Sequence, residues 1–318
     1  AKIKIIISKI MKIDEFIKNE FINFFESENQ NFIKITSENY TESFSFQWKK
    51  FQELQIDSKN NMNLSYERFK HTKWSKNELA GKSVLEVGSG AGRFTELLMD
   101  CSPLLFTIDS SEAIYVNFEN NKLNKNSKKT FFIRNQVEND IFKNNSFDFV
   151  FCYGVIQHTK NIFETLDFLI SKLKQNGKLS VDFYRTWSIP FCWNHPKYFW
   201  RPITKNMNSE TLMKIIDFYI PIYLPIDTFL KKLFGKYGPY ICGLIPIPCW
   251  NYYDIIIEDK KLNLEMAKLD TFDALSAKYD HPVTKKQINN HMKKYNNCDY
   301  ELTYGSNGIV MNLQKNSL

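Results

Sequence analysis

Short apolar runs alternate with segments of helical periodicity through the middle of the chain. Mostly apolar runs of four to six residues predict strands, at 83–87, 104–108, 130–133, 147–152 and 178–183. Between these runs, apolar positions three and four apart predict helices, near 92–100, 111–120 and 162–174. Strands that are buried on both faces and joined by helices form a parallel, doubly wound sheet, so the pattern predicts an α/β fold.

The last part of the chain predicts a helix followed by a hairpin. Thr284 and Gln287 have the spacing of a capping box, which places a helix start there. The sequence then reads DYELTYG, SNG and IVMNLQ, the pattern of strand, turn and strand. We therefore expect a Rossmann-like sheet of seven strands that the hairpin completes with an antiparallel member.

The remaining segments flank or interrupt this sheet. We expect residues 1–80 to form an N-terminal helical cap and residues 81–184 the ligand-binding core, which residues 282–318 complete. Residues 185–281 then form a large insertion between the fifth and sixth strands. Because it leaves the carboxyl end of a parallel strand, where open α/β sheets bind ligands, we expect it to act as a lid for the substrate.

Part of this insertion, residues 215–253, is unusually apolar, aromatic and rich in proline. Its longer uncharged run, 237–253, is too short to span a bilayer and is broken by three prolines. Two interpretations remain open for residues 215–253. They are a packing segment punctuated by proline, or an apolar surface for a membrane or a lipid-linked substrate.

Composition narrows the class of protein. The 318 residues are 43% hydrophobic and 24% charged, as in ordinary globular proteins. The net charge of +7 comes from lysines scattered along the chain, so no nucleic-acid partner is expected. The six cysteines form no CxxC pair, and the five histidines show no metal-ligand spacing. We expect reduced thiols in a cytoplasmic protein, with no metal.

The stretch SVLEVGSGAGRF, residues 83–94, carries the most specific chemistry. Gly88, Gly90 and Gly92 follow the first core strand and precede a helix, so a ligand can approach bare backbone there. Dinucleotide-binding loops favour GxGxxG, whereas these glycines alternate and Arg93 follows them. With Glu86 in the preceding strand, the stretch resembles the first motif of class I S-adenosylmethionine (SAM)-dependent methyltransferases.

This resemblance implies further cofactor contacts. Asp109, at the end of the second strand, would accept hydrogen bonds from the ribose hydroxyls, with Ser110 beside it; Asp109 can also cap the next helix. Gln136 falls where an acidic residue usually meets adenine, and the Val137 amide would face a ring nitrogen. Further along, CYGVIQHT resembles the segment beside the sulfonium. The implied cofactor-binding set is Glu86, Gly88, Gly90, Gly92, Asp109, Ser110, Gln136, Val137, Cys152 and Tyr153.

Three polar residues near the ends of the fourth and fifth strands are candidates for catalysis. His158 can take a proton from an oxygen acceptor, or it can simply hydrogen-bond neighbouring backbone. Asp182 and Tyr184 face the same way by strand alternation and can line an acceptor pocket. Alternatively, Asp182 forms an ion pair with a lysine or arginine of the cap.

The predicted function is SAM-dependent methyl transfer, with S-adenosylhomocysteine as product. A weaker likeness to methyltransferase-domain proteins of bacterial surface-glycan biosynthesis clusters implies a small or glycan-linked acceptor, methylated at oxygen. One alternative is a SAM-binding scaffold or regulator without catalysis. The other, an NAD-dependent sugar-modifying oxidoreductase or epimerase, is disfavoured by Arg93 and by the hairpin ending.

Overall fold

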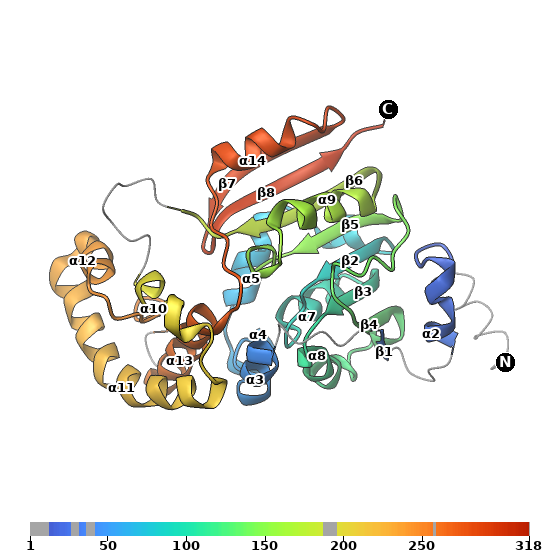
Figure 1. Ribbon diagram of the computed structural model, residues 1–318. Helices are drawn as coiled ribbons and strands as arrows, with labels where there is room; N and C mark the ends of the chain where they lie inside the picture. Colours follow the sequence, from blue (N-terminus) through green and yellow to red (C-terminus); the bar gives the residue numbers. More distant parts are fainter. Residues whose placement is uncertain (1–12, 27–31, 36–41, 187–195, 257–258, 318) are drawn as a thin grey trace. The chain divides into compact units, whose positions relative to one another are not determined.

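The computed structural model describes residues 13–26, 32–35, 42–186, 196–256 and 259–317 (Figure 1). The chain divides into two compact units. The first unit consists of residues 1–39, 56–185 and 279–318, and the second of residues 40–55 and 186–278. The expected N-terminal cap therefore contributes to both units, because residues 40–55 cluster with the insertion.

The first unit contains a sheet of eight strands in the order β1-β4-β3-β2-β5-β6-β8-β7. Neighbouring strands are parallel from β1 to β6, whereas β8 is antiparallel to both β6 and β7. The hairpin predicted at the end of the chain is thus present at one edge. The strands are β1 Phe32–Lys34, β2 Ser83–Val87, β3 Leu104–Asp109, β4 Thr130–Arg134, β5 Phe147–Cys152, β6 Leu173–Phe183, β7 Cys298–Gly305 and β8 Gly308–Lys315.

The prediction of seven strands is wrong by one. The additional strand, β1, pairs in parallel with β4 at the other edge of the sheet. Ile33 is buried there, and the ring of Phe32 stacks on that of Tyr115 at a centroid distance of 4.6 Å. A strand of three residues is too short to show an alternating pattern, so packing against the sheet defines it rather than local sequence.

Helices cover both faces of the sheet (Figure 1). One apolar cluster joins the sheet to helices α9 and α14, through residues such as Leu166 and Ile288. A second cluster joins it to α5–α8, through residues such as Leu98 and Ile114. The helices of this unit are α2 Ile22–Glu26, α4 Asp57–Asn60, α5 Leu64–Phe69, α6 Lys76–Leu79, α7 Arg93–Asp100, α8 Ala113–Asn121, α9 Ile162–Lys172 and α14 Lys285–Met292, with 3-10 turns η1 Asn19–Phe21, η3 Lys70–Thr72, η4 Ser127–Lys129 and η5 Ile156–His158.

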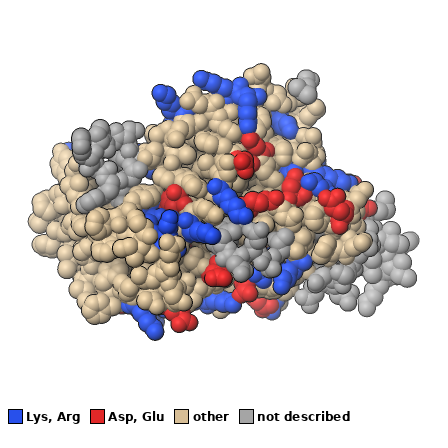
Figure 2. Space-filling view, in the orientation of Figure 1, with Lys and Arg blue, Asp and Glu red and all other residues tan. Residues whose placement is uncertain are grey.

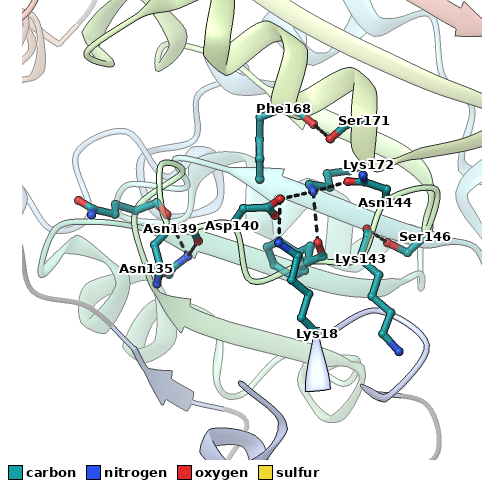
Figure 3. Close-up of polar contacts among 12 residues, drawn as sticks. Lys18, Asn135, Asn139, Asp140, Lys143, Asn144, Ser146, Phe168, Ser171 and Lys172 are labelled. Atoms are coloured by element: carbon teal, nitrogen blue, oxygen red, sulfur yellow. Dashed lines mark hydrogen bonds and ion pairs between the residues drawn. The ribbon is translucent and has the colours of Figure 1, made fainter. Parts of the chain in front are cut away.

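A fully buried lysine ties the end of α9 to the loop that precedes β5 (Figure 3). The Lys172 ammonium donates to Asp140 Oδ2 at 2.7 Å, to Asn144 Oδ1 at 2.7 Å and to the Phe142 carbonyl at 3.2 Å. Its three protons therefore have three acceptors. Burial lowers the pKa of Lys172, and the Asp140 carboxylate opposes that shift.

The second unit is helical and consists of α3 Glu42–Lys50, α10 Lys197–Thr204, α11 Ser209–Phe234, η6 Gly235–Tyr237, α12 Gly238–Leu244 and α13 Lys260–Ser276. α11 packs against α12 and α13. It continues through Pro221 and Pro225, although proline removes a backbone donor from a helix. Among the described residues, no helix is long and apolar enough to cross a bilayer.

Candidate active site

The glycine loop lies between the end of β2 and the start of α7. Gly88, Gly90 and Gly92 have φ angles of 74°, 53° and 97°. L-residues rarely adopt this left-handed region, so the backbone path itself favours glycine at all three positions.

Side chains of the protein also crowd two of these glycines. A Cβ at Gly88 would overlap the side chain of Val155, and a Cβ at Gly92 would overlap those of Asn117 and Asn121. At these two positions the requirement for a bare backbone therefore comes from the fold. The sequence had suggested that a ligand makes the close approach.

Asp109 anchors the loop to the neighbouring strand. Its Oδ2 accepts a hydrogen bond from the Gly90 amide at 2.8 Å, and its Oδ1 accepts from the Ser111 amide at 2.8 Å and hydroxyl at 2.6 Å. Each carboxylate oxygen can accept two bonds, so Oδ2 retains one acceptor position. Burial raises the pKa of Asp109, while the bonds from Ser111 and Gly90 oppose the rise.

The N-cap position of α8 is Glu112, whose side chain makes no capping bond in the described structure, so the cap considered for Asp109 is not formed. The Ser111 hydroxyl accepts a bond from the Ala113 amide at 3.1 Å, at the start of α8. Ser110, the other residue expected to contact the cofactor, lies half-buried between the two. Asp109 is therefore linked to the start of α8 through the Ser111 hydroxyl.

Glu86 lies beneath the loop and is only 1% exposed. The hydroxyl of Thr95, on α7, donates to Glu86 Oε2 at 2.6 Å. Oε1 has no hydrogen-bond partner among the described residues. Because burial disfavours the charged form, the pKa of Glu86 is raised to about 7.

The other residues expected to contact the cofactor follow β4 and β5. Gln136 is buried, and its backbone carbonyl accepts a hydrogen bond from Asn135 Nδ2 at 2.9 Å. Val137 packs against the apolar cluster that joins the sheet to α9 and α14. The Cys152 side chain belongs to that same cluster, whereas the Tyr153 ring belongs to the cluster that joins the sheet to α5–α8. At positions 152 and 153, the side chains therefore belong to the two faces of the core.

Asp182, near the end of β6, is held by several donors and is 1% exposed. Arg68 of α5 donates to Oδ2 at 2.7 Å, and Asn307 donates to the same atom at 3.2 Å. The Gly154 amide donates to Oδ1 at 2.5 Å. The alternative that Asp182 pairs with a cation of the N-terminal segment is thus found. The bond from the Gly154 amide to the same carboxylate ties it to the chain just after β5.

His158 and Tyr184 lie against each other. Their rings meet edge to face, with centroids 5.3 Å apart. His158 Nδ1 lies 2.9 Å from the Tyr279 carbonyl oxygen, which can only accept a hydrogen bond. In the neutral ring Nδ1 therefore carries the proton and Nε2 the lone pair, which is the arrangement required of a general base.

Gln157 is not among the site residues that the sequence predicts. Its side chain is completely buried, and neither amide atom has a hydrogen-bond partner among the described residues. The Gln157 carbonyl accepts from the His281 amide at 3.0 Å, which fixes the backbone. No pattern in a single sequence reports whether a buried amide is paired. A buried polar group left unpaired costs about 1–3 kcal/mol, so it marks a candidate ligand contact.

Comparison with known protein families gives a match. Residues 61–205 match a family model described as a methyltransferase domain. No curated protein matches the chain. The match confirms the enzyme class that the sequence predicts, a methyltransferase, and supports SAM as its cofactor.

Several solved structures resemble the chain at low identity. One, from Methanococcus maripaludis, is provisionally described as a SAM-dependent methyltransferase; it is 12% identical, with a TM-score of 0.48 and coverage of 89% of this chain and 99% of that chain. Another is phosphoethanolamine N-methyltransferase 1 of Haemonchus contortus, in complex with phosphoethanolamine and S-adenosylhomocysteine. It is 20% identical, with a TM-score of 0.37 and coverage of 49% of this chain and 34% of that chain.

Proposed function

We propose that the chain transfers the methyl group of SAM to an oxygen atom of a small or glycan-linked acceptor. One observation carries the proposal. The glycine loop and the Gln157–His158 pair follow the carboxyl ends of the parallel strands β2 and β5, and Asp109 is the last residue of β3 between them in the chain. Open α/β sheets bind their ligands at this edge.

The residues at this edge suit an adenosyl sulfonium. Asp109 would hold the ribose through the remaining acceptor position on Oδ2, beside the Gly90 amide that already donates to that atom. The buried hydroxyl of Ser89 has no partner among the described residues and would serve as a further polar contact. SAM, when bound, supplies an electrophilic methyl group for in-line displacement.

His158 is proposed as the general base. An oxygen acceptor loses a proton when it is methylated, and the lone pair on Nε2 can receive it. The Tyr279 carbonyl would stabilise the protonated ring, since it accepts the hydrogen bond from Nδ1. Asp182 is proposed as a positioning residue, because its carboxylate is occupied by Arg68, Asn307 and Gly154.

The acceptor would be recognised in part by Gln157. A carboxamide offers an acceptor oxygen and a donor nitrogen, which match hydroxyl groups that both donate and accept. Neighbouring hydroxyls of a sugar carry that pair of functions. This chemistry supports a glycan-linked acceptor, in line with the weaker likeness of the sequence to proteins of surface-glycan biosynthesis clusters. In this scheme residues 185–281 would form the acceptor-side insertion.

Transfer of labelled methyl tests the proposal. Wild-type protein is incubated with methyl-labelled SAM and the glycan and polar-lipid fractions of the organism that encodes it. We expect a labelled ether. The variant His158→Ala should lower its rate by about 10²–10³-fold while SAM affinity stays within about threefold.

A histidine on α14 provides the matched control. His291 pairs with Asp167 and stacks on Phe163, so His291→Ala should keep the rate of the wild type. Equal rates for His158→Ala and wild type would remove His158 from the mechanism. A labelled amine or a labelled carbon in place of an ether would refute methylation at oxygen.

A further inference from the structure

The outer face of α11 carries a continuous row of exposed apolar side chains. We call it the apolar ridge and define it by Ile215, Phe218, Ile222, Ile226, Phe229 and Leu233. These residues recur every three or four positions, so they lie along one face of the helix. Phe218 is 74% exposed and Phe229 is 62% exposed.

The opposite face of the same helix already supplies the core of the second unit. Ile216, Ile220 and Leu224 are buried on that side, where α11 packs against α12 and α13. α11 is therefore apolar around most of its circumference, while the unit buries only one face. Packing within the unit explains the buried residues and does not explain the ridge.

Charge is arranged around the ridge in a specific way. Residues 211–253 contain two acids, Asp217 and Asp227, and both form ion pairs with lysines. The exposed lysines lie at the ends of the row. Lys214 lies at one end, one turn after the exposed Glu210, and Lys232 and Lys236 lie at the other. In Figure 2 the second unit presents a broad surface with few charged side chains. The ridge is therefore apolar along its length, with lysines at both ends and the excess of positive charge at the end that carries Lys232 and Lys236.

Aromatic side chains extend this surface beyond Lys236. Tyr237 is 61% exposed and Tyr240 is 58% exposed. Tyrosine prefers the boundary between apolar and polar surroundings, because its ring is apolar and its hydroxyl is polar. Lysine tolerates the same boundary by extending its apolar stem and keeping its ammonium in water.

We propose that the apolar ridge binds in the plane of a membrane surface that contains anionic lipid. An amphipathic helix that lies in this plane inserts its apolar face, while its lysines meet the negative headgroups. The ridge extends over 19 residues from Ile215 to Leu233, about 27 Å of helix. That length lies along the surface instead of across the bilayer, since α11 is not apolar enough to span it.

The charge pattern favours lipid over a second copy of the chain. In a two-fold dimer, each ridge would pack on an identical ridge. In a parallel pair, Lys232 and Lys236 would meet the same lysines of the other copy, and such contacts repel. An antiparallel pair would set these two lysines against an end that holds Lys214 and Glu210. An anionic lipid surface instead complements all three lysines at once. Membrane binding needs neither SAM nor catalysis, so it is independent of the proposed function.

Vesicle co-sedimentation of the full chain tests this proposal. The vesicles contain phosphatidylcholine alone, or phosphatidylcholine with about one third phosphatidylglycerol. We expect the wild type to sediment with the anionic vesicles, less so at high salt and weakly with the neutral ones. The double variant Phe218→Glu, Phe229→Glu should partition at least tenfold less. The triple variant Lys214→Gln, Lys232→Gln, Lys236→Gln should lose roughly fivefold per lysine on anionic vesicles only.

The matched control places the same charge on another exposed apolar residue. Leu123, in the first unit, is 91% exposed, and Leu123→Glu should sediment like the wild type. Far-ultraviolet circular dichroism checks that each variant is folded. Three results would overturn the proposal. The first is that the wild type does not sediment with vesicles. The second is that the Phe218→Glu, Phe229→Glu variant sediments as much as the wild type. The third is that the wild type is a dimer that does not bind vesicles and that becomes monomeric in this variant.

Discussion

Two buried polar side chains of the first unit differ in how many hydrogen-bond partners they have. Lys172, at the end of α9, donates all three of its protons to acceptors within 3.2 Å. Gln157, just after β5, has no partner for either amide atom among the described residues. Both side chains are 0% exposed. The same core thus satisfies all the hydrogen bonds of one buried polar side chain and, among the described residues, none of those of the other.

We interpret this difference as a structural role for Lys172 and a ligand-binding role for Gln157. A buried ammonium is tolerated only when its bonds are satisfied, so the Lys172 cluster is explained by stability alone. The Gln157 amide lowers stability and is not compensated within the described part of the chain. It lies at the edge of the sheet that also holds the glycine loop and Asp109. We infer that ligand binding accounts for it.

The largest effect on the free energy of unfolding is expected at Lys172, whose hydrogen bonds are all satisfied. Lys172→Met leaves Asp140 and Asn144 without their buried donor, so the free energy of unfolding should fall by about 3 kcal/mol. Urea unfolding followed by circular dichroism measures it. Lys18 pairs with the same carboxylate at 3.1 Å but is half-exposed, and Lys18→Met should cost less than about 1 kcal/mol. Equal losses for the two variants would contradict the distinction.

An intermediate effect is expected at Glu86, which has a partner for one oxygen only. Its pKa in the folded state, about 7, lies above the ordinary value of 4.5, so the folded state binds the proton more tightly. The free energy of unfolding should therefore fall as pH rises from about 4.5 to 7, and remain low above that. Glu86→Gln should remove this fall and be the more stable protein at pH 8, by about 2 kcal/mol.

Urea unfolding at pH 5 and pH 8 measures the effect at Glu86. The gain of the Gln variant should be present at pH 8 and small at pH 5, where the wild-type carboxyl is already protonated in the folded state. A wild-type stability that does not change between these pH values would show that the pKa of Glu86 is not raised.

The smallest effect on stability is expected at Gln157. Gln157→Leu keeps the volume and breaks no side-chain hydrogen bond in the described structure, so stability should be unchanged or higher by about 1 kcal/mol. Methyl transfer should nevertheless fall at least tenfold. The matched control is Asn117, a buried amide that bonds Thr95 and Asn121. Asn117→Leu should lose about 2 kcal/mol. A comparable loss for Gln157→Leu would mean that its amide is paired after all.

The sheet was predictable to the extent that each strand has its own pattern. The runs at 83–87 and 147–152 are buried on both faces and correspond to β2 and β5. The capping box at Thr284 also forms as predicted. β1 was missed because three residues carry no periodicity. Pro221 and Pro225 lie on the exposed side of α11, where their rings do not enter the packed core.

The candidate site was predictable only in its outline. Motif and strand order placed the glycine loop and Asp109 at one edge, and the pairing of Asp182 with a cation was an open alternative. That the cation is Arg68, 114 residues away in the sequence, depends on tertiary structure. Whether the Gln157 amide has a hydrogen-bond partner depends on every residue that packs around it. Such a property emerges from packing and is not encoded in any local pattern.

Titration calorimetry with SAM tests the central claim most directly. The account predicts that SAM and S-adenosylhomocysteine each bind one site per chain and that NAD gives no binding heat. Asp109→Ala should weaken SAM at least tenfold, since it removes a charge-assisted bond and the anchor of the Gly90 amide. Binding of NAD without binding of SAM, or equal SAM affinity of Asp109→Ala and the wild type, would contradict it.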